Sequence, residues 1–272
     1  MQQIPSQPML YDEIRREAES KTASLKTISS IISKDMGMTA KIMQLVNSAY
    51  FGLRGTVSTA EHAVNLLGLD TVQALVLTVH VFSQFTSTPG SRFDIAHLWE
   101  ASTQTGVLAR AIANAEQAAA SVIDQAYTAG LLHDVGTLVL AANSLKQYDA
   151  MIETAHDKGV LLSEVERQEL GATHADIGAY LLGLWGLGDP IVEAVAFHHY
   201  PSNCLGNTFS PLTAVHVANV LQQELSHQAI GGVPSQIDFT YLDRLHMTDR
   251  LPHWREVAST AQRELEKERA HG

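Results

Sequence analysis

Histidine and aspartate residues gather at a few points in the second half of the chain. The segment GLLHDVG places His133 beside Asp134 within an apolar run. Three more histidines complete the set: His174, His198 and His199. Imidazole and carboxylate groups are common ligands of first-row divalent metals, and a water bound to such a metal can attack a phosphodiester. These residues therefore predict a metal site, with phosphodiester hydrolysis as the chemistry that it would allow.

The same residues also have a purely structural interpretation. A histidine on a helix is often a partly buried core residue, or a favourable charge at the C-terminal end of the helix. His198 and His199 fit the second role, because they directly precede Tyr200 and Pro201. The pair His133–Asp134 is costly to bury alone, so it must face a metal ion, a partner or itself. The sequence leaves these alternatives open.

The elements that must position these residues are helices. Apolar residues recur at helical spacing along the chain, and no alternating pattern is long enough to build a sheet. Residues that favour helix N-caps mark the predicted starts, which are Ser58, Asp70, Asp94, Ser121, Thr173, Asp189 and Ser210. The helix after Thr173 should turn Ile177, Leu181 and Leu184 inward. The fold class predicted from these patterns is all-α, with an exposed loop at 229–237 and a charged surface helix at the C-terminal end.

Composition limits the classes of function. The 272 residues are 45% hydrophobic and 17% charged, which is typical of a globular protein with a sizeable core. The net charge of −11 argues against non-specific binding to DNA or to an anionic membrane. The apolar runs are too short to cross a bilayer. Because Cys204 is the single cysteine, it cannot form an intramolecular disulfide, and we expect a reducing, cytoplasmic setting.

The chain has a soft boundary near residues 86–93. We expect an N-terminal helical lobe over 1–90, packed on a second helical lobe over 91–225, with a helical extension over 226–272. In the first lobe, Asn47 lies near a predicted helix end, where its side chain could hold the following loop. Asn47, Tyr50 and Arg54 are also candidates for contact with a partner, because aromatic and arginine residues often anchor interfaces.

Two signatures resemble a known family. GLLHDVG, followed by THADIGAYLLGLWGLGDPIVEAVAFHH, resembles the HD superfamily of metal-dependent phosphohydrolases, and more closely its relative, the HDOD domain (HD-related output domain) of bacterial signalling proteins. IISKDMGMTAKIMQLVNSAYFG, followed by VSTAEHAVNLLGLDTVQALVL, looks like the N-terminal part of the HDOD signature. The resemblance covers roughly residues 20–225 and implies an HD-like helical lobe.

The chain departs from the catalytic members of the superfamily. The resemblance places two of their metal ligands at Ala101 and Asn219, which are poor ligands or none. His97 lies one helical turn before Ala101. A lysine that follows the His-Asp pair in HD-GYP phosphodiesterases is Thr137 here, and their Gly-Tyr-Pro segment is missing after His199.

The resemblance with these departures implies a non-catalytic output or adaptor domain in bacterial signal transduction, for example the output part of a response regulator. Its partners would be signalling proteins: receivers, sensor kinases or nucleotide-signalling proteins. We expect no cofactor, although a single divalent metal (Mn, Fe, Mg or Zn) could be held by the retained His133, Asp134, His174, His198 and His199. The alternatives are a metal-dependent phosphohydrolase with a reduced ligand set and a nucleotide sensor.

Overall fold

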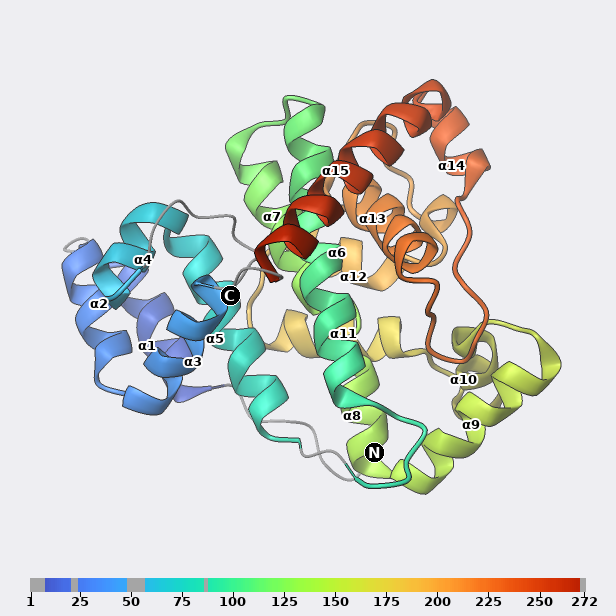
Figure 1. Ribbon diagram of the computed structural model, residues 1–272, viewed down its shortest axis with the longest axis horizontal. Helices are drawn as coiled ribbons and strands as arrows, with labels where there is room; N and C mark the ends of the chain where they lie inside the picture. The colour runs from blue at the N-terminus through green and yellow to red at the C-terminus, as the bar shows by residue number, and fades with distance from the viewer. Residues whose placement is uncertain (1–7, 21–23, 48–56, 86–87, 270–272) are drawn as a thin grey trace. The chain divides into compact units, whose positions relative to one another are not determined.

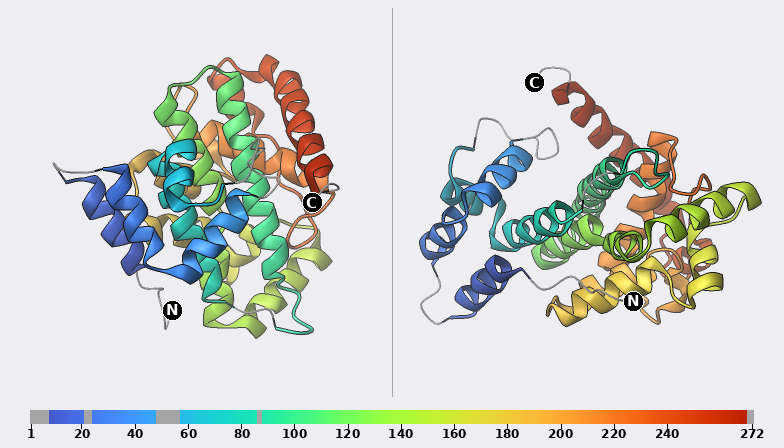
Figure 2. Two further views of the ribbon diagram at one scale, coloured as in Figure 1. Left: turned by 60° about the vertical axis from the view of Figure 1, so that its left-hand side comes forward. Right: turned by 90° about the horizontal axis from the view of Figure 1, so that it is seen from below.

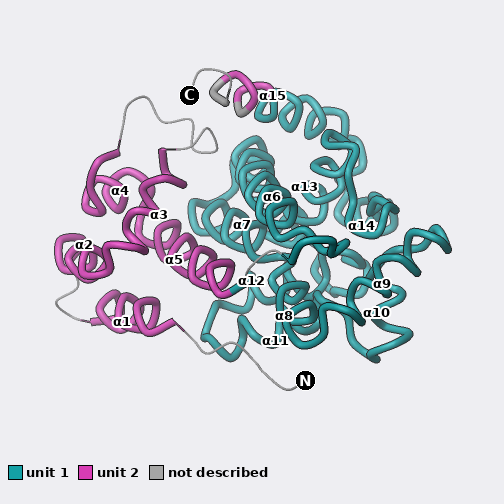
Figure 3. The backbone as a smooth tube through the Cα atoms, turned by 60° about the horizontal axis from the view of Figure 1, so that its bottom comes forward, with its two compact units in different colours: residues 1–4, 85–262 teal, residues 5–84, 263–272 magenta. Residues whose placement is uncertain are grey.

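The computed structural model describes residues 8–20, 24–47, 57–85 and 88–269. Helices are the regular elements of these ranges, which contain no strand, so the predicted all-α fold is confirmed (Figure 1). None of the helices described is long and apolar enough to span a membrane. The chain divides into two compact units, a larger one that contains residues 85–262 and a smaller one that contains residues 5–84 and 263–272 (Figure 3). The three-part division expected from the sequence stays a prediction.

Between residues 5 and 84, the described part of the smaller unit forms five helices. They are α1 (Met9–Ala18), α2 (Leu25–Ser33), α3 (Met36–Val46), α4 (Ala60–Leu67) and α5 (Leu69–Ser83). Side chains at their starts satisfy free backbone amides: Ser24 caps α2, Asp35 caps α3 and Thr59 caps α4. Ile14, Ile28, Ile32, Ile42 and Val64 are buried among these helices. Local capping and apolar periodicity therefore explain this unit.

Two predicted N-caps in the smaller unit are wrong, one by one residue and the other by two. Thr59, and not Ser58, is the N-cap of α4, because its hydroxyl accepts the amide of His62. Gly68 ends α4, with φ of 82°. Glycine adopts this positive φ without strain, and α5 begins directly after it at Leu69, so Asp70 lies in the first turn of α5 instead of capping it.

The side chain of Asn47 links the end of α3 to the segment that precedes α4. Its Nδ2 donates to the carbonyl oxygens of Met43 (2.9 Å) and Val57 (2.7 Å), and its Oδ1 accepts the amide of Val57 (2.6 Å). The side chain thus bridges the end of α3 and the segment before α4. Contact of Asn47 with a partner stays a prediction, and Tyr50 and Arg54 lie outside the described residues.

The larger unit is built around α6 (Ile95–Ala115). Helix α7 (Ala120–Leu132) runs beside it, and α13 (Pro211–Ser226) and α12 (Asp189–Phe197) pack on this pair (Figures 1 and 2). Glycines allow the close approach of α6 and α7, because a Cβ on Gly130 would lie 2.7 Å from the Cα of Gly106. Helix α8 (Val135–Asn143) pairs with α11 (His174–Leu184).

The remaining helices cover the edges of the larger unit. They are α9 (Leu145–Lys158), α10 (Leu162–Leu170), α14 (Phe239–Arg244) and α15 (Leu251–Arg269), with short 3₁₀ turns at Pro201–Asn203 and Thr248–Arg250. The C-terminal helix is less exposed than predicted. Trp254 at its start is fully buried, and its Nε1 donates to Glu116 at the end of α6 (2.7 Å).

Helix starts with a side-chain cap were predicted best. Asp94, Thr173 and Ser210 are the N-caps of α6, α11 and α13. Ser121 is wrong by one residue, because α7 begins at Ala120 without a side-chain cap, and Asp189 is the first helical residue after Gly188. Ile177 and Leu181 are buried as expected. Leu184 is 57% exposed, because the neighbouring Trp185 takes the buried position at the end of α11.

Candidate metal centre

Asp134 lies at the junction of two helices. It follows His133 at the end of α7 and precedes α8, whose first turn contains Gly136. A Cβ on Gly136 would overlap the carbonyl oxygen of His174 and lie 2.7 Å from the amide nitrogen of Gly178. Glycine is therefore required here for α8 to meet the first turn of α11. This close approach brings Asp134 beside His174.

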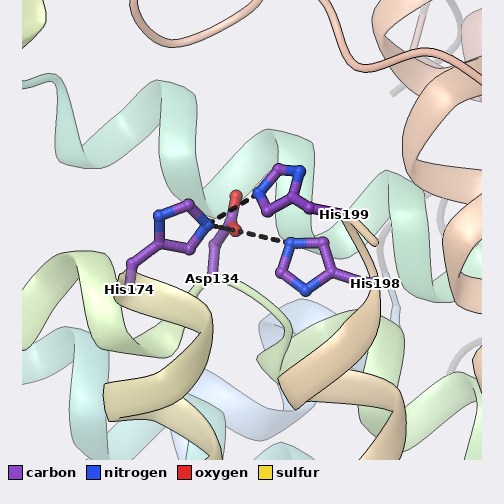
Figure 4. Close-up of side chains that lie close together, drawn as sticks. All are labelled: Asp134, His174, His198 and His199. Carbon is purple, nitrogen blue, oxygen red and sulfur yellow. Dashed lines mark hydrogen bonds and ion pairs between the residues drawn. The ribbon is translucent and has the colours of Figure 1, made fainter. Parts of the chain in front are cut away.

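Four side chains from three segments of the chain point toward one another. Asp134, His174, His198 and His199 each offer a ligand atom, and these atoms all lie within 4.8 Å of one another (Figure 4). Asp134 Oδ1 lies 3.3 Å from His174 Nε2 and 3.6 Å from His198 Nε2. His174 Nε2 lies 2.9 Å from His199 Nε2. The structure thus brings together residues that are up to 65 positions apart in the sequence.

Hydrogen bonds on the far side of the rings fix their orientation. Nδ1 of His133 lies 2.8 Å from the carbonyl oxygen of Gly130, and Nδ1 of His198 lies 2.8 Å from that of Val195. A carbonyl oxygen only accepts, so both Nδ1 atoms must carry the proton. Nε2 of each ring is then turned toward Asp134. Metal-bound histidines in proteins are oriented by the same type of outer hydrogen bond.

The charges around His198 fit a cation. Burial lowers the pKa of His198 to about 3, and the nearby His133 adds to this effect, so the ring is neutral near pH 7. Because Nδ1 carries its proton, Nε2 offers only a lone pair, and this buried atom has no hydrogen-bond partner in the described chain. The lone pair faces the carboxylate of Asp134. Two electron-rich atoms repel each other at this distance, whereas a cation between them would be bound by both.

Asp134 and His199 also have suitable charges. Burial alone would raise the pKa of Asp134, but contacts with His133 and His174 outweigh burial and hold this pKa well below its usual value. Burial, together with the neighbouring His198, lowers the pKa of His199 well below that of free histidine. An ionised carboxylate and neutral imidazoles are the forms that coordinate a metal. Asp134, His198 and His199 therefore fit a divalent cation as they stand, and His174, whose pKa is raised by Glu166, would release a proton to bind one.

Glu166 accepts a hydrogen bond from Nδ1 of His174, the ring nitrogen opposite the one that faces Asp134. This fully buried carboxylate accepts hydrogen bonds from His174 Nδ1 (2.7 Å), from the backbone amide of His174 (2.8 Å) and from the hydroxyl of Tyr148 (2.7 Å). Burial would lower the pKa of His174, but the charge of Glu166 and the contact with Asp134 raise it well above the usual value. Glu166 was not predicted from the sequence. The sequence does hold one sign that Glu166 is buried: helical spacing puts Glu166 on the same apolar face as Leu162.

His133 belongs to the cluster but differs from the other histidines. Its Nε2 lies 3.2 Å from Asp134 Oδ2, whereas His174 and His198 are paired with Oδ1, and its ring lies edge-on to that of His198. It is not a member of the four-ligand group. Its expected role as a ligand therefore stays a prediction, whereas its contact with Asp134 is a structural fact.

The chain matches the HDOD domain family over residues 4–201, which include both halves of the signature and the histidine cluster. It belongs to the HDOD domain family. An uncharacterized protein of Treponema pallidum (strain Nichols) is 30% identical to the HDOD chain over 196 residues, which are 72% of this chain and 37% of that protein. The chain thus corresponds to a little over a third of the length of this relative.

Solved structures share the HDOD fold at low identity. An HDOD domain protein of unknown function from Geobacter sulfurreducens superposes with a TM-score of 0.75 at 20% identity, over 98% of this chain and 92% of that one. A Shewanella amazonensis SB2B protein, provisionally named a phosphohydrolase, gives a TM-score of 0.68 at 21% identity, over 96% and 95% of the two chains. A provisionally named signal transduction protein from Marinobacter aquaeolei VT8 gives 0.69 at 22%, over 98% and 59%.

A small cavity of about 40 Å³ adjoins the four-ligand group. Asp134, His174 and His199 line it, together with Ala101 of α6 and Asn219 of α13. Both positions at which the resemblance to HD enzymes predicts further ligands therefore lie in the wall of this cavity. Ala101 offers no donor atom, and the side-chain oxygen of Asn219 accepts a hydrogen bond from Gln223 (3.0 Å).

The segment between α13 and α14, here called the 227–238 loop, covers one side of the cavity. Gln228, Ala229, Ile230, Val233 and Ser235 of this loop contribute to the lining. Ser235 is buried, its hydroxyl lies 3.2 Å from Nδ1 of His199, and its amide donates to Gln223 (2.6 Å). The prediction of an exposed loop at 229–237 is thus only partly correct, because its polar groups bond to the cluster and to α13.

Proposed function

We propose that this HDOD chain is a signalling domain that binds one divalent cation in its histidine cluster and does not hydrolyse phosphoesters. The observation that carries the proposal is the ligand count. Two positions that would hold further ligands in an HD enzyme are Ala101 and Asn219 in the cavity wall. The remaining ligand atoms form a single group from four side chains, which is enough for one ion.

The size of the cavity supports the same proposal. Small-molecule sites in proteins usually enclose about 300–1,000 Å³. The cavity beside the cluster is about 40 Å³, and the 227–238 loop closes one side of it. A cyclic dinucleotide does not fit into this space, whereas a few waters or a small ion do.

The residue types indicate which cations the cluster would select. Asp134, His174, His198 and His199 would hold the ion, and Glu166 and the carbonyl oxygens of Gly130 and Val195 orient the rings around it. Three imidazoles and one carboxylate favour Mn, Fe or Zn, whereas Mg prefers ligand sets made of oxygen alone. A bound cation in such a site can polarise an oxygen ligand or acidify a water.

The signalling part of the proposal rests on the family and on fold similarity. The HDOD signature is that of an output domain, and one structural neighbour is provisionally named a signal transduction protein. We infer that this chain acts in the cytoplasm through contacts with receiver, kinase or nucleotide-signalling proteins. A size-exclusion or calorimetric binding experiment with a candidate receiver protein would check this part separately.

The metal and the absence of turnover can be tested together. The chelator-treated protein is titrated with Mn²⁺ while bound metal is counted, and the loaded protein is then assayed with cyclic dinucleotides and an aryl phosphodiester. We expect one ion per chain, a loss of binding in His198→Ala, unchanged binding in the exposed-histidine control His253→Ala, and no turnover. Two bound ions, or no ion, would contradict the proposal.

A metal-dependent phosphohydrolase is the second candidate. It is favoured by the buried, unpartnered Nε2 of His198, which faces Asp134 as it would in a working metal site. Turnover of a phosphodiester that requires Mn²⁺ and disappears in both His133→Ala and Asp134→Ala would establish this candidate. The same activity retained in either variant would indicate a contaminating enzyme.

A further inference from the structure

The N-terminal residues of α10 line the cavity beside the cluster. Leu161, Leu162 and Ser163, which form the N-cap and the first two helical positions, all line this cavity. The first amides of a helix have no partner within the helix. Those of Leu162 and Ser163 make no hydrogen bond to any described residue, whereas the following two amides donate to Leu161. Two backbone donors without a described partner and the positive end of the helix therefore belong to residues that line one small cavity.

Unpartnered side-chain atoms line the same space. The Ser163 side chain is almost fully buried (2% exposed), and its hydroxyl has no hydrogen-bond partner in the described chain. His97 of α6 also lines the cavity, and its buried Nε2 lacks a described partner as well. Buried polar groups are normally satisfied, so two such atoms around one cavity indicate that a polar ligand completes them.

We propose that Ser163 and the first turn of α10 form a subsite for a small tetrahedral oxyanion of the phosphate class, with His97 as a further contact. This inference rests on the proposed cation. Asp134 lines the cavity, while no lysine or arginine does, so an anion alone would be repelled. A cation at Asp134 and the histidines reverses that charge, and the oxyanion would then bind between the cation and the helix N-terminus.

The dimensions of the cavity restrict the ligand. About 40 Å³ is space for roughly three waters, which an inorganic phosphate or a single phosphoryl group can replace. The nucleoside part of a nucleotide would require movement of the 227–238 loop. Free phosphate and the phosphoryl group of a nucleotide share the chemistry of this subsite, and the experiment must separate them.

Paramagnetic broadening of ³¹P signals provides the test. Protein in excess over Mn²⁺ is mixed with inorganic phosphate in one arm and with adenosine monophosphate in another. We expect broadening of the phosphate signal with loaded wild-type protein, and at least tenfold weaker phosphate affinity in Ser163→Ala with Mn²⁺ affinity unchanged. Thr105→Val, which removes another buried unpartnered hydroxyl outside this cavity, should behave like wild type.

The outcomes separate this inference from the proposed function. If Mn²⁺ binds but phosphate is not broadened, or if Ser163→Ala binds phosphate as wild type does, the subsite is refuted and the metal site stands. If Mn²⁺ does not bind, the proposed metal site and the oxyanion subsite are both refuted. Broadening of phosphate alone supports a subsite for the free ion, and broadening of both ligands supports one that accepts the phosphoryl group of a nucleotide.

Discussion

Gly136 touches the backbone of His174, and this contact sets the position of the cluster. The glycine lies two residues after Asp134, and a side chain on it would overlap the carbonyl oxygen of His174. The first turns of α8 and α11 can approach this closely only without a Cβ. The short segment HDVG in the sequence thus combines the ligand Asp134 with the glycine that brings its partner histidine within reach.

Gly136→Ala is therefore expected to separate α8 from α11. Overpacking of a dense core costs about 1–3 kcal/mol, and the overlap here is with backbone, which cannot move aside as a side chain does. We expect a lower free energy of unfolding by urea and a loss of Mn²⁺ affinity. Gly183→Ala on α11 is the control, because its new methyl group would meet nothing within 4 Å. Equal stability of the two variants would contradict this account of Gly136.

Glu166→Gln tests whether the carboxylate behind His174 tunes the metal site. Glutamine has the same shape and can still accept from His174, but it lacks the charge that raises the pKa of this histidine. Loss of such an outer partner typically weakens metal binding by about 10–100-fold. Titration with Mn²⁺ should show this decrease, while urea unfolding of the metal-free protein should change much less. Glu169→Gln, at an exposed position of the same helix, should leave the affinity unchanged.

Removal of the metal should lower the thermal stability of the larger unit. A ligand that binds only the folded state at 100 times its Kd adds about 2.7 kcal/mol. For a unit of this size, that corresponds to a shift in Tm of roughly 5–11 °C. Calorimetry with Mn²⁺ and then with a chelator in excess would measure it. The same shift in His198→Ala would show that the stabilising ion binds elsewhere.

Local features made most of the fold predictable. Asp94, Thr173 and Ser210 mark true helix starts, because a capping side chain acts within its own turn. The helices that start at Ala120 and Asp189 have no side-chain cap, so the sequence pattern misplaced their starts by one residue. The five residues of the cluster were predicted because histidine and aspartate are conspicuous in apolar surroundings.

Long-range relationships could not be predicted in the same way. Glu166 resembles any helical glutamate until α10 is placed against α11, where it becomes the buried acceptor for His174. The 227–238 loop is polar, so the sequence predicts that it is exposed. Its polar groups are partly buried because they bond to residues distant in the sequence, as Ser235 does to His199. Both features depend on tertiary contacts, which override local pattern.

Restoring the two missing ligands tests whether ligand number is what limits the cluster to a single ion. Ala101 and Asn219 both line the cavity beside the four-ligand group, on α6 and α13. The double variant Ala101→His, Asn219→Asp adds an imidazole and a carboxylate, which are better ligands than a methyl group and an amide. We expect it to bind a second Mn²⁺ ion per chain, whereas each single variant retains one tight ion. Bound metal is counted by atomic emission after gel filtration, with Ala101→Leu as the control, because leucine has a volume similar to that of histidine and no ligand atom, while Asn219 already has the shape of aspartate. A double variant that still binds one ion would mean that ligand number is not what limits this cluster.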